Sequence, residues 1–403
     1  MNTLLYALFE ALRRHRWLRL LACAFIFTSL GNGLTQVLVF GLLLEWRAPA
    51  SLLTLAWLFA TLPGFVGSLL GEKLCARFSP VAILLMAELL GFIALLFPLL
   101  GIHYHSVVSL LAVQSSEALL GGMSWPALTL LFKRGLTGAE LPAATCLENI
   151  IFASQVLLGT GLGVVMFSHV PAGALLIIDA ASFMGSMWLL LLAGRWLPGC
   201  VTPSAQERIE PVALRWRCLT RRQKRSLLLL PALAAVGAPA MALLPALAQQ
   251  IAPTNAAGLA LPLLFARSMG QLCGPLLLNR DSLPRYARHN RRLLLCLSFF
   301  LLCYAALPLI EERQAVALGL IFVAHLASNI IFAAGTFGVL SSFQAAQVSS
   351  ASGKAWRWQT LSASIFTCLA ALLAGPLGAA QALWLVSTGA LLTVAMVLLR
   401  YRE

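Results

Sequence analysis

Two charged residues stand near the middle of long apolar segments, where they could bind ions. Glu117 follows Gln114 and two serines, and Arg267 lies in a separate apolar segment. A charge is costly inside a hydrocarbon layer, so such residues usually face a polar interior or a water-filled cavity. There a carboxylate can take up and release protons, while an arginine keeps its charge and binds anionic groups through its planar fork. We expect Glu117 to carry protons and Arg267 to contact an anionic ligand, with a structural polar or ionic pair as the alternative for each.

Other polar residues stand at a similar depth in their own apolar segments. Asn32 lies about halfway along the first segment, and His325 and Asn329 lie about halfway along the tenth. His325 could contact a ligand, or it could be a buried histidine satisfied by its neighbours. Amide and imidazole groups donate and accept hydrogen bonds, so these residues favour a polar ligand. The predicted substrate-binding residues are Arg267, His325, Asn329, Asn32, Gln36, Gln271 and Gln114.

The composition predicts that lipid surrounds most of this chain. Hydrophobic residues make up 60% of it, charged residues 10%, and the mean hydropathy is +0.88, whereas soluble domains average about 25% charged residues. The formal charge of +14 could suit a nucleic acid, but the basic residues punctuate apolar segments instead of clustering with aromatic ones. The nine cysteines are scattered without CxxC spacing or histidine partners, so we expect neither a metal site nor a cofactor.

The basic residues fall in alternate gaps between the apolar segments. Of the 28 Lys and Arg residues, Arg47 and Arg313 stand in the intervening gaps and Arg267 lies inside a segment. Short cytoplasmic loops carry an excess of Lys and Arg. The basic gaps and both termini are therefore expected in the cytoplasm, and the number of spans is even.

Turns and charges divide the apolar sequence into twelve segments of about 20 residues or more, the length that crosses a bilayer. They lie near residues 18–44, 51–73, 80–102, 106–132, 142–168, 172–196, 227–250, 256–279, 292–310, 314–343, 354–376 and 379–399. The sequence thus predicts an all-α integral membrane fold of two six-helix bundles, residues 18–197 and 227–403, joined by a cytoplasmic linker at 198–226. Residues 1–17 carry leucines roughly on one helical side, as in a helix lying on a membrane surface; a cytoplasmic extension of the first span is the alternative.

Short motifs in both halves resemble those of one transporter family. They are Trp125-Pro126-Ala127, Cys146-Leu147-Glu148-Asn149, Asp179-Ala180-Ala181-Ser182-Phe183, Gly353-Lys354 and Gly375-Pro376-Leu377-Gly378. The chain resembles the major facilitator superfamily, in the branch of macrolide-efflux-like proteins and the enterobactin exporter. The resemblance implies that spans 1, 4, 7 and 10 line a central cavity, flanked by spans 2, 5, 8 and 11, so the polar residues above would face that cavity.

The resemblance also implies a gate at the cytoplasmic ends of the spans. The loop from Gly71 to Ser79 keeps a glycine and an arginine of the family's motif but lacks its aspartate. Lys73 and Arg77 in this loop, with Arg357 at the start of span eleven, are the expected gating residues. Glu148, near the cytoplasmic end of span five, is a second candidate for proton coupling.

Together these features favour a proton-coupled exporter of a polar, anionic small molecule that works by alternating access. A siderophore of carboxylate, hydroxamate or catecholate type is the expected substrate, and a multidrug or macrolide efflux antiporter is the alternative. No Walker loop or other catalytic motif lies in a polar loop, so an enzyme is not expected. The expected partners are the substrate, protons and the lipid bilayer, without nucleic acid, and we expect a monomer in a bacterial inner (cytoplasmic) membrane.

Overall fold

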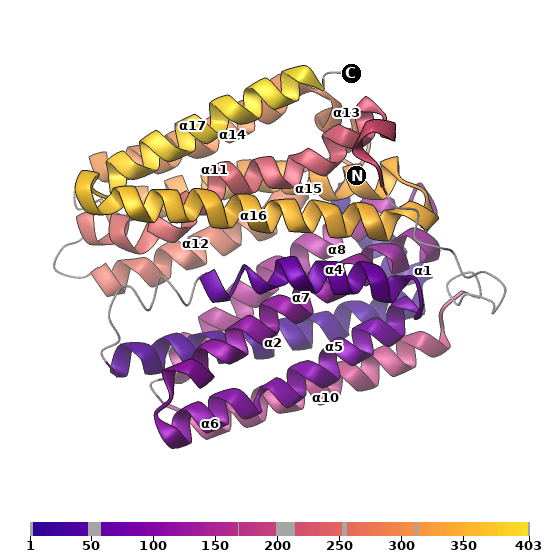
Figure 1. Cartoon of the computed structure of the whole chain (residues 1–403), viewed down its shortest axis with the longest axis horizontal. Coiled ribbons are helices and arrows are strands. Elements are labelled where there is room, and N and C mark those ends of the chain that lie inside the picture. The colour runs from indigo at the N-terminus through magenta and orange to yellow at the C-terminus, as the bar shows by residue number, and fades with distance from the viewer. Residues whose placement is uncertain are drawn as a thin grey trace. The chain divides into compact units, whose positions relative to one another are not determined.

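Helices account for nearly all of the described chain. The computed structural model describes residues 3–46, 58–167, 169–198, 214–251, 256–310 and 313–401. Within these ranges, β-pairing is limited to one isolated bridge between Thr3 and Asn279. Figure 1 shows the helices coloured along the chain. The predicted all-α class is confirmed.

The chain separates into two compact units. The N-terminal unit comprises Leu8–Ala213 and Gln344–Arg357, and the C-terminal unit comprises Met1–Ala7, Leu214–Phe343 and Trp358–Glu403. The expected linker at 198–226 contains one boundary, but its residues 199–213 lie outside the described part. The units differ from a simple division of the chain, because a short segment of the second half groups with the first.

The N-terminal unit holds the helices of the first half. They are α2 (Arg16–Glu45), α4 (Pro63–Cys75), α5 (Pro80–Ala94) followed by α6 (Leu96–Tyr104), α7 (Val107–Gly135), α8 (Leu141–Ser154) followed by the π-helix η1 (Gln155–Thr160) and α9 (Gly161–Phe167), and α10 (Ala172–Arg195). Serine side chains cap two of them: Ser79 accepts a hydrogen bond from the Ala82 amide at the start of α5, and Ser106 accepts one from the Ser109 amide at the start of α7. Such caps satisfy amides that have no partner within the helix.

The C-terminal unit holds most of the remaining helices. They are α11 (Arg221–Ile251), α12 (Ala256–Leu277), the short α13 (Leu283–Arg288), α14 (Asn290–Ala306), α15 (Gln314–Ser342), α16 (Ala345–Leu377) from Trp358 onward, and α17 (Ala379–Arg400). Gly378 separates α16 from α17 with a φ of 83°, a conformation that glycine adopts without a Cβ clash.

The helices account for the twelve predicted spans. In the described residues, ten helical segments are long and apolar enough to cross a membrane. The second and the eighth predicted spans correspond to α4 and α12. The beginning of the second predicted span, residues 51–57, lies outside the described part. The chain is therefore a multi-pass membrane protein.

Glycines bring α4 and α7 into close contact. A Cβ atom on Gly67 would overlap the carbonyl oxygen of Leu119, and one on Gly122 would overlap that of Gly64. Small residues allow helix backbones to approach this closely within a membrane. The contact fixes the part of α7 that carries Glu117.

The predicted N-terminal amphipathic segment forms helix α1 (Leu4–Arg14), which ends just before α2 begins. Its buried side differs from the expected leucine stripe. Leu4 and Leu8 are buried as expected, but Leu5 is 42% exposed, and Ala7 and Ala11 are buried in its place. The difference arises because adjacent residues point about 100° apart around a helix, so Leu4 and Leu5 cannot share one narrow face.

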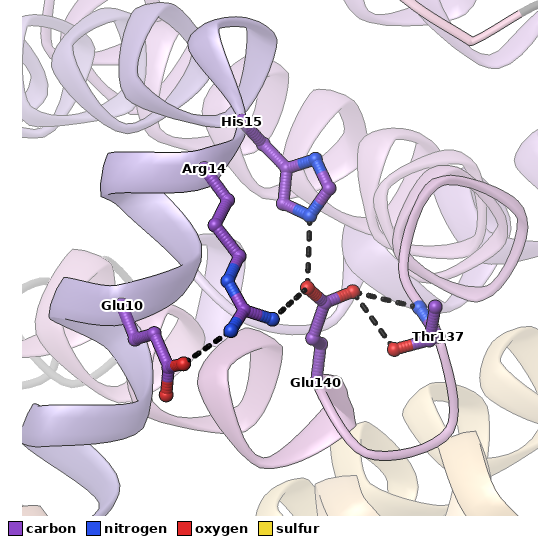
Figure 2. A network of polar contacts seen from close by, with 5 residues as sticks. All are labelled: Glu10, Arg14, His15, Thr137 and Glu140. Atoms are coloured by element: carbon purple, nitrogen blue, oxygen red, sulfur yellow. Dashed lines mark hydrogen bonds and ion pairs between the residues drawn. The ribbon is translucent and has the colours of Figure 1, made fainter.

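A polar network within the N-terminal unit joins the junction of α1 and α2 to the loop between α7 and α8 (Figure 2). The carboxylate of Glu140 lies 3.0 Å from His15 Nε2, and it accepts hydrogen bonds of 3.0 and 2.9 Å from the amide and hydroxyl of Thr137. Arg14 lies 3.8 Å from Glu140 and pairs with Glu10 at 2.5 Å. Burial alone would raise the pKa of Glu140, but the hydrogen bonds from His15 and Thr137 outweigh it and lower that pKa.

Candidate functional site

Two carboxylates are buried among hydroxyl groups inside the N-terminal unit. Glu88 on α5 accepts a hydrogen bond of 2.8 Å from the Thr28 hydroxyl on α2. Asp179 on α10 accepts one from Thr35 on α2 and one of 3.2 Å from Ser182. Hydroxyl donors of this kind offset part of the cost of burying an acid. These hydrogen bonds also connect α2 to α5 and to α10.

Glu117 lies on α7 close to this acidic group. Its Oε1 atom is buried and has no hydrogen-bond partner within the described ranges. Asp179 is close enough for its charge to act on Glu117. The neighbouring Gln114 is 2% exposed, and its Nε2 atom is likewise without a partner among the described residues. Polar atoms buried in this way lack the bonds that interior groups normally make.

Other predicted residues of the N-terminal unit lie on α2 and α8. Asn32 is half-buried, with an Oδ1 atom that has no partner in the described part of the chain. Gln36 is half-buried one turn further along α2. Glu148, the second predicted proton carrier, is 2% exposed and lies on α8, a different helix from Glu117.

The first part of α16 packs against α4 and α7 within the N-terminal unit. Arg357 forms an ion pair of 2.8 Å with Glu72. The hydroxyls of Thr129 and Ser352 are 2.9 Å apart. The predicted span began near residue 354, but α16 begins at Ala345, because the small residues before Gly353 continue the helix without a proline to stop it.

The three predicted gating residues are therefore in different situations. Arg357 is engaged with Glu72. Lys73 and Arg77 are exposed, and neither forms an ion pair with a residue that the structure describes. The indole rings of Trp125 and Trp356 also meet here, with centroids 4.9 Å apart.

His325, in the C-terminal unit, uses both of its ring nitrogens. Nε2 lies 2.8 Å from the Tyr304 hydroxyl on α14, and Nδ1 lies 3.3 Å from the Ser328 hydroxyl. Since Ser328 donates its hydrogen to the His325 carbonyl, its oxygen is free to accept from Nδ1–H, and Nε2 then accepts from Tyr304. The ring of Phe300 lies perpendicular to the imidazole, with the two ring centroids 5.4 Å apart. His325 thus fits the satisfied interior histidine that the sequence left as an alternative.

Arg267 on α12 lies beside this pair. It is 7% exposed, and its charge acts on both Tyr304 and His325. Its Nε atom has no hydrogen-bond partner among the described residues. The one acidic residue in the described part of this unit is Asp281, which pairs with Arg280. No acid of the described C-terminal unit is therefore available to neutralise Arg267.

Two amides lie close by, where α12 and α15 meet. Asn329 Nδ2 donates to the Gln271 carbonyl. Gly274 makes this approach possible, since a Cβ atom there would lie 2.6 Å from that of Asn329. The side-chain oxygens of Gln271 and Asn329 are buried without partners in the described ranges. The structure thus brings together four predicted residues: Arg267, Gln271, His325 and Asn329.

Tyr304 is the residue of this group that sequence reasoning missed. It lies in an apolar run, and its hydroxyl is fully buried against His325. A buried tyrosine hydroxyl usually has a partner. A tyrosine inside a predicted span near a central histidine was the available signal.

Sequence comparison finds a relative that matches part of the chain. No family model matches the sequence. A stretch of 74 residues is 62% identical to an uncharacterized 29.9 kDa protein from the crtE 3′ region of Pseudescherichia vulneris. This match covers 18% of the chain and about a quarter, 27%, of that relative's length.

Solved structures match over almost the whole chain. A bacterial homologue of the iron transporter ferroportin, in the outward-facing state, has a TM-score of 0.70 at 15% identity, covering 95% of this chain and 98% of that one. The human organic anion transporter MFSD10 (TETRAN) has a TM-score of 0.66 at 16% identity, covering 95% and 97%. The E. coli fucose:proton symporter FucP has a TM-score of 0.66 at 12% identity, covering 96% and 98%. The chain therefore has the major facilitator fold.

Proposed function

We propose that this protein is a secondary active transporter that exports a polar, anionic small molecule in exchange for protons. The observation that carries the proposal is the separation of buried charge between the units. In the C-terminal unit, Arg267 is buried without an acidic partner among the described residues. In the described N-terminal unit, Glu88, Glu117 and Asp179 form no ion pair with a base.

An isolated buried arginine favours an anionic ligand. Leaving a charge buried and unpaired is strongly destabilising, and a carboxylate or phenolate oxygen of the substrate would supply the missing partner. The unpartnered oxygens of Gln271 and Asn329 would accept hydrogen bonds from hydroxyl or amide groups of the same ligand. His325 would act on the ligand through Tyr304.

Proton coupling belongs in this proposal to Glu117, with Glu148 as the second candidate. Glu117, a buried carboxylate that forms no ion pair with a described base, can bind a proton in one conformation and release it in another. Gln114, Asn32 and Gln36 would add polar contacts on the same side. Lys73, Arg77 and Arg357 would act as the gate on the cytoplasmic side.

A siderophore fits these requirements better than a drug or a macrolide. Its carboxylate, catecholate or hydroxamate oxygens match an arginine, and its polar groups match the amides. The fold neighbours are named as an iron transporter homologue, an organic anion transporter and a proton symporter, which supports transport of this general kind. The competing function is efflux of drugs or macrolides. The proposed location is a bacterial inner membrane, with both termini in the cytoplasm.

Secretion by a deletion strain tests the proposal. The strain would be grown without iron and complemented with the wild type, Arg267→Ala, or Arg313→Ala as an exposed arginine control. We expect siderophore to accumulate inside the cells and to fall in the medium with the empty vector and with Arg267→Ala, but not with Arg313→Ala. Normal secretion in the deletion strain, together with hypersensitivity to macrolides or lipophilic cations, would instead support drug efflux.

A further inference from the structure

One end of the C-terminal unit presents exposed arginines with almost no acid among them. Six of these side chains, which we call the basic rim, are Arg217, Arg221, Arg285, Arg291, Arg292 and Arg400. None of the six forms an ion pair with a residue that the structure describes. Asp281, the one acid in the described part of this unit, is paired with Arg280. Among the described residues, the basic rim is therefore a surface of positive charge.

A buried arginine brings the helix ends that carry the basic rim together. Arg225 on α11 is 2% exposed, and its Nε atom donates a hydrogen bond of 2.7 Å to the Ala287 carbonyl in α13. Its guanidinium also bonds to the side chain of Asn290 at the start of α14. Asn290 in turn donates a hydrogen bond of 2.7 Å to the Leu398 carbonyl near the end of α17. The basic rim is thus one continuous site and not four separate helix ends.

Aromatic residues lie at the same end of the unit. The ring of Trp216 is 5.2 Å from Trp358 and 5.9 Å from Tyr401, measured between centroids. The Lys224 ammonium lies 5.6 Å from the Trp216 ring. Trp and Tyr are enriched at the level of the lipid headgroups. This cluster indicates that the basic rim lies at the edge of the bilayer.

Membrane topology alone does not explain why the described residues around the basic rim include so little acid. The positive-inside rule depends on Lys and Arg, and Asp and Glu contribute little to it, so acids would be tolerated. The N-terminal unit does place acids beside such basic residues: Glu10 and Glu140 lie next to Arg14, and Glu72 pairs with Arg357. By contrast, no described acid pairs with the basic rim, so its positive charge can attract an anion from outside the chain.

We propose that the basic rim binds the phosphate headgroup of an anionic phospholipid. Arginine forks bind phosphate oxygens in a bidentate manner, and basic residues next to membrane spans attract anionic lipids. A bilayer presents phosphate at the depth of the aromatic cluster. The aromatic rings favour a position beside lipid headgroups, and a soluble anion would not require them.

Lipid retention by the full-length protein tests this proposal. The purified protein in detergent would be titrated with phosphatidylglycerol, and bound lipid would be counted by native mass spectrometry. The variant Arg217→Gln/Arg221→Gln/Arg400→Gln removes three charges from the basic rim. The matched control Arg13→Gln/Arg19→Gln/Arg195→Gln removes three exposed charges from the N-terminal unit. Phosphatidylcholine and free glycerol 3-phosphate serve as ligand controls.

We expect the first variant to bind phosphatidylglycerol about ten- to a hundred-fold more weakly, since each basic side chain near an anionic membrane contributes about five-fold. The control variant should stay within about two-fold of the wild type. Equal losses in both variants would mean unspecific attraction and would overturn the site. Saturable binding of glycerol 3-phosphate that displaces the lipid would reassign the basic rim to a soluble phosphate compound. Equal retention of phosphatidylcholine would also contradict the proposal.

Discussion

The hydroxyl of Tyr304 lies 2.8 Å from Nε2 of His325, and this contact joins α14 to α15 beside the buried guanidinium of Arg267. Because the other ring nitrogen faces Ser328, the imidazole is held on both sides. His325 therefore positions Tyr304, and Tyr304 is the group placed next to Arg267.

Removing the Tyr304 hydroxyl should destabilise the protein. Tyr304→Phe leaves His325 Nε2 buried without a donor, which costs about 1–3 kcal/mol. We expect a lower midpoint of thermal unfolding in detergent and weaker substrate binding. Tyr104→Phe is the control, since Tyr104 is 69% exposed. An unfolding midpoint and substrate affinity equal to those of the wild type would show that the hydrogen bond has no role.

The contact between α4 and α7 should not tolerate a side chain at its centre. Gly67→Ala places a methyl group on the Leu119 carbonyl, and overpacking of this kind costs about 1–3 kcal/mol. Gly121→Ala on α7 is the control, because a Cβ atom there meets nothing within 4 Å. Thermal unfolding of the two variants would be compared. Equal unfolding midpoints would contradict the close packing described above.

The network around Glu140 should make part of the stability depend on pH. Hydrogen bonds lower the pKa of Glu140 in the folded protein, so its contribution is present above the unfolded value of about 4.3 and is lost as the pH falls through the folded value. We expect Glu140→Gln to destabilise the protein by about 0.5–1 kcal/mol at pH 7. The difference from the wild type should shrink as the pH is lowered below about 4. Glu45→Gln, at an exposed site, serves as the control. A difference for Glu140→Gln that is constant with pH would exclude the ionic origin.

Glu117 should be required for coupling and not for folding. Glu117→Gln keeps the size of the side chain but cannot exchange protons. In vesicles with an imposed pH gradient, we expect Glu117→Gln to abolish gradient-driven transport. Exchange of substrate between equal concentrations on the two sides of the membrane, without a pH gradient, should continue. Undiminished gradient-driven transport would eliminate this role and favour Glu148, for which Glu148→Gln is the corresponding test.

The sequence was sufficient to predict the spans and much of the polar group around Arg267. Spans are predictable because a bilayer imposes a length and an apolar composition on each helix. Arg267, His325 and Asn329 were recognisable because polar groups at that depth are rare and costly.

Features that depend on packing between distant segments could not be predicted in this way. The hydrogen bond from Arg225 to the Ala287 carbonyl joins residues 62 positions apart. By sequence alone, Arg225 is one of many basic residues expected in a cytoplasmic loop. The contacts of Ser352 with Thr129 on α7 and of Arg357 with Glu72 on α4 likewise join residues far apart in the sequence. Tyr304 was overlooked because its apolar ring suits a span and its hydroxyl partner lies on another helix.

Proton flux in proteoliposomes tests the central claim, that Arg267 binds an anionic substrate whose movement is coupled to protons. A pH-sensitive dye would report flux after addition of an anionic siderophore or, separately, of a lipophilic cation. We expect the siderophore to drive flux through the wild type and the Arg313→Ala control. Arg267→Ala should need roughly ten- to a hundred-fold more substrate, because a charged hydrogen bond contributes about 1.5–3 kcal/mol, and Arg267→Lys should recover part of the loss. Flux that responds to the cation and not to the siderophore, with Arg267→Ala as active as the wild type, would contradict the account.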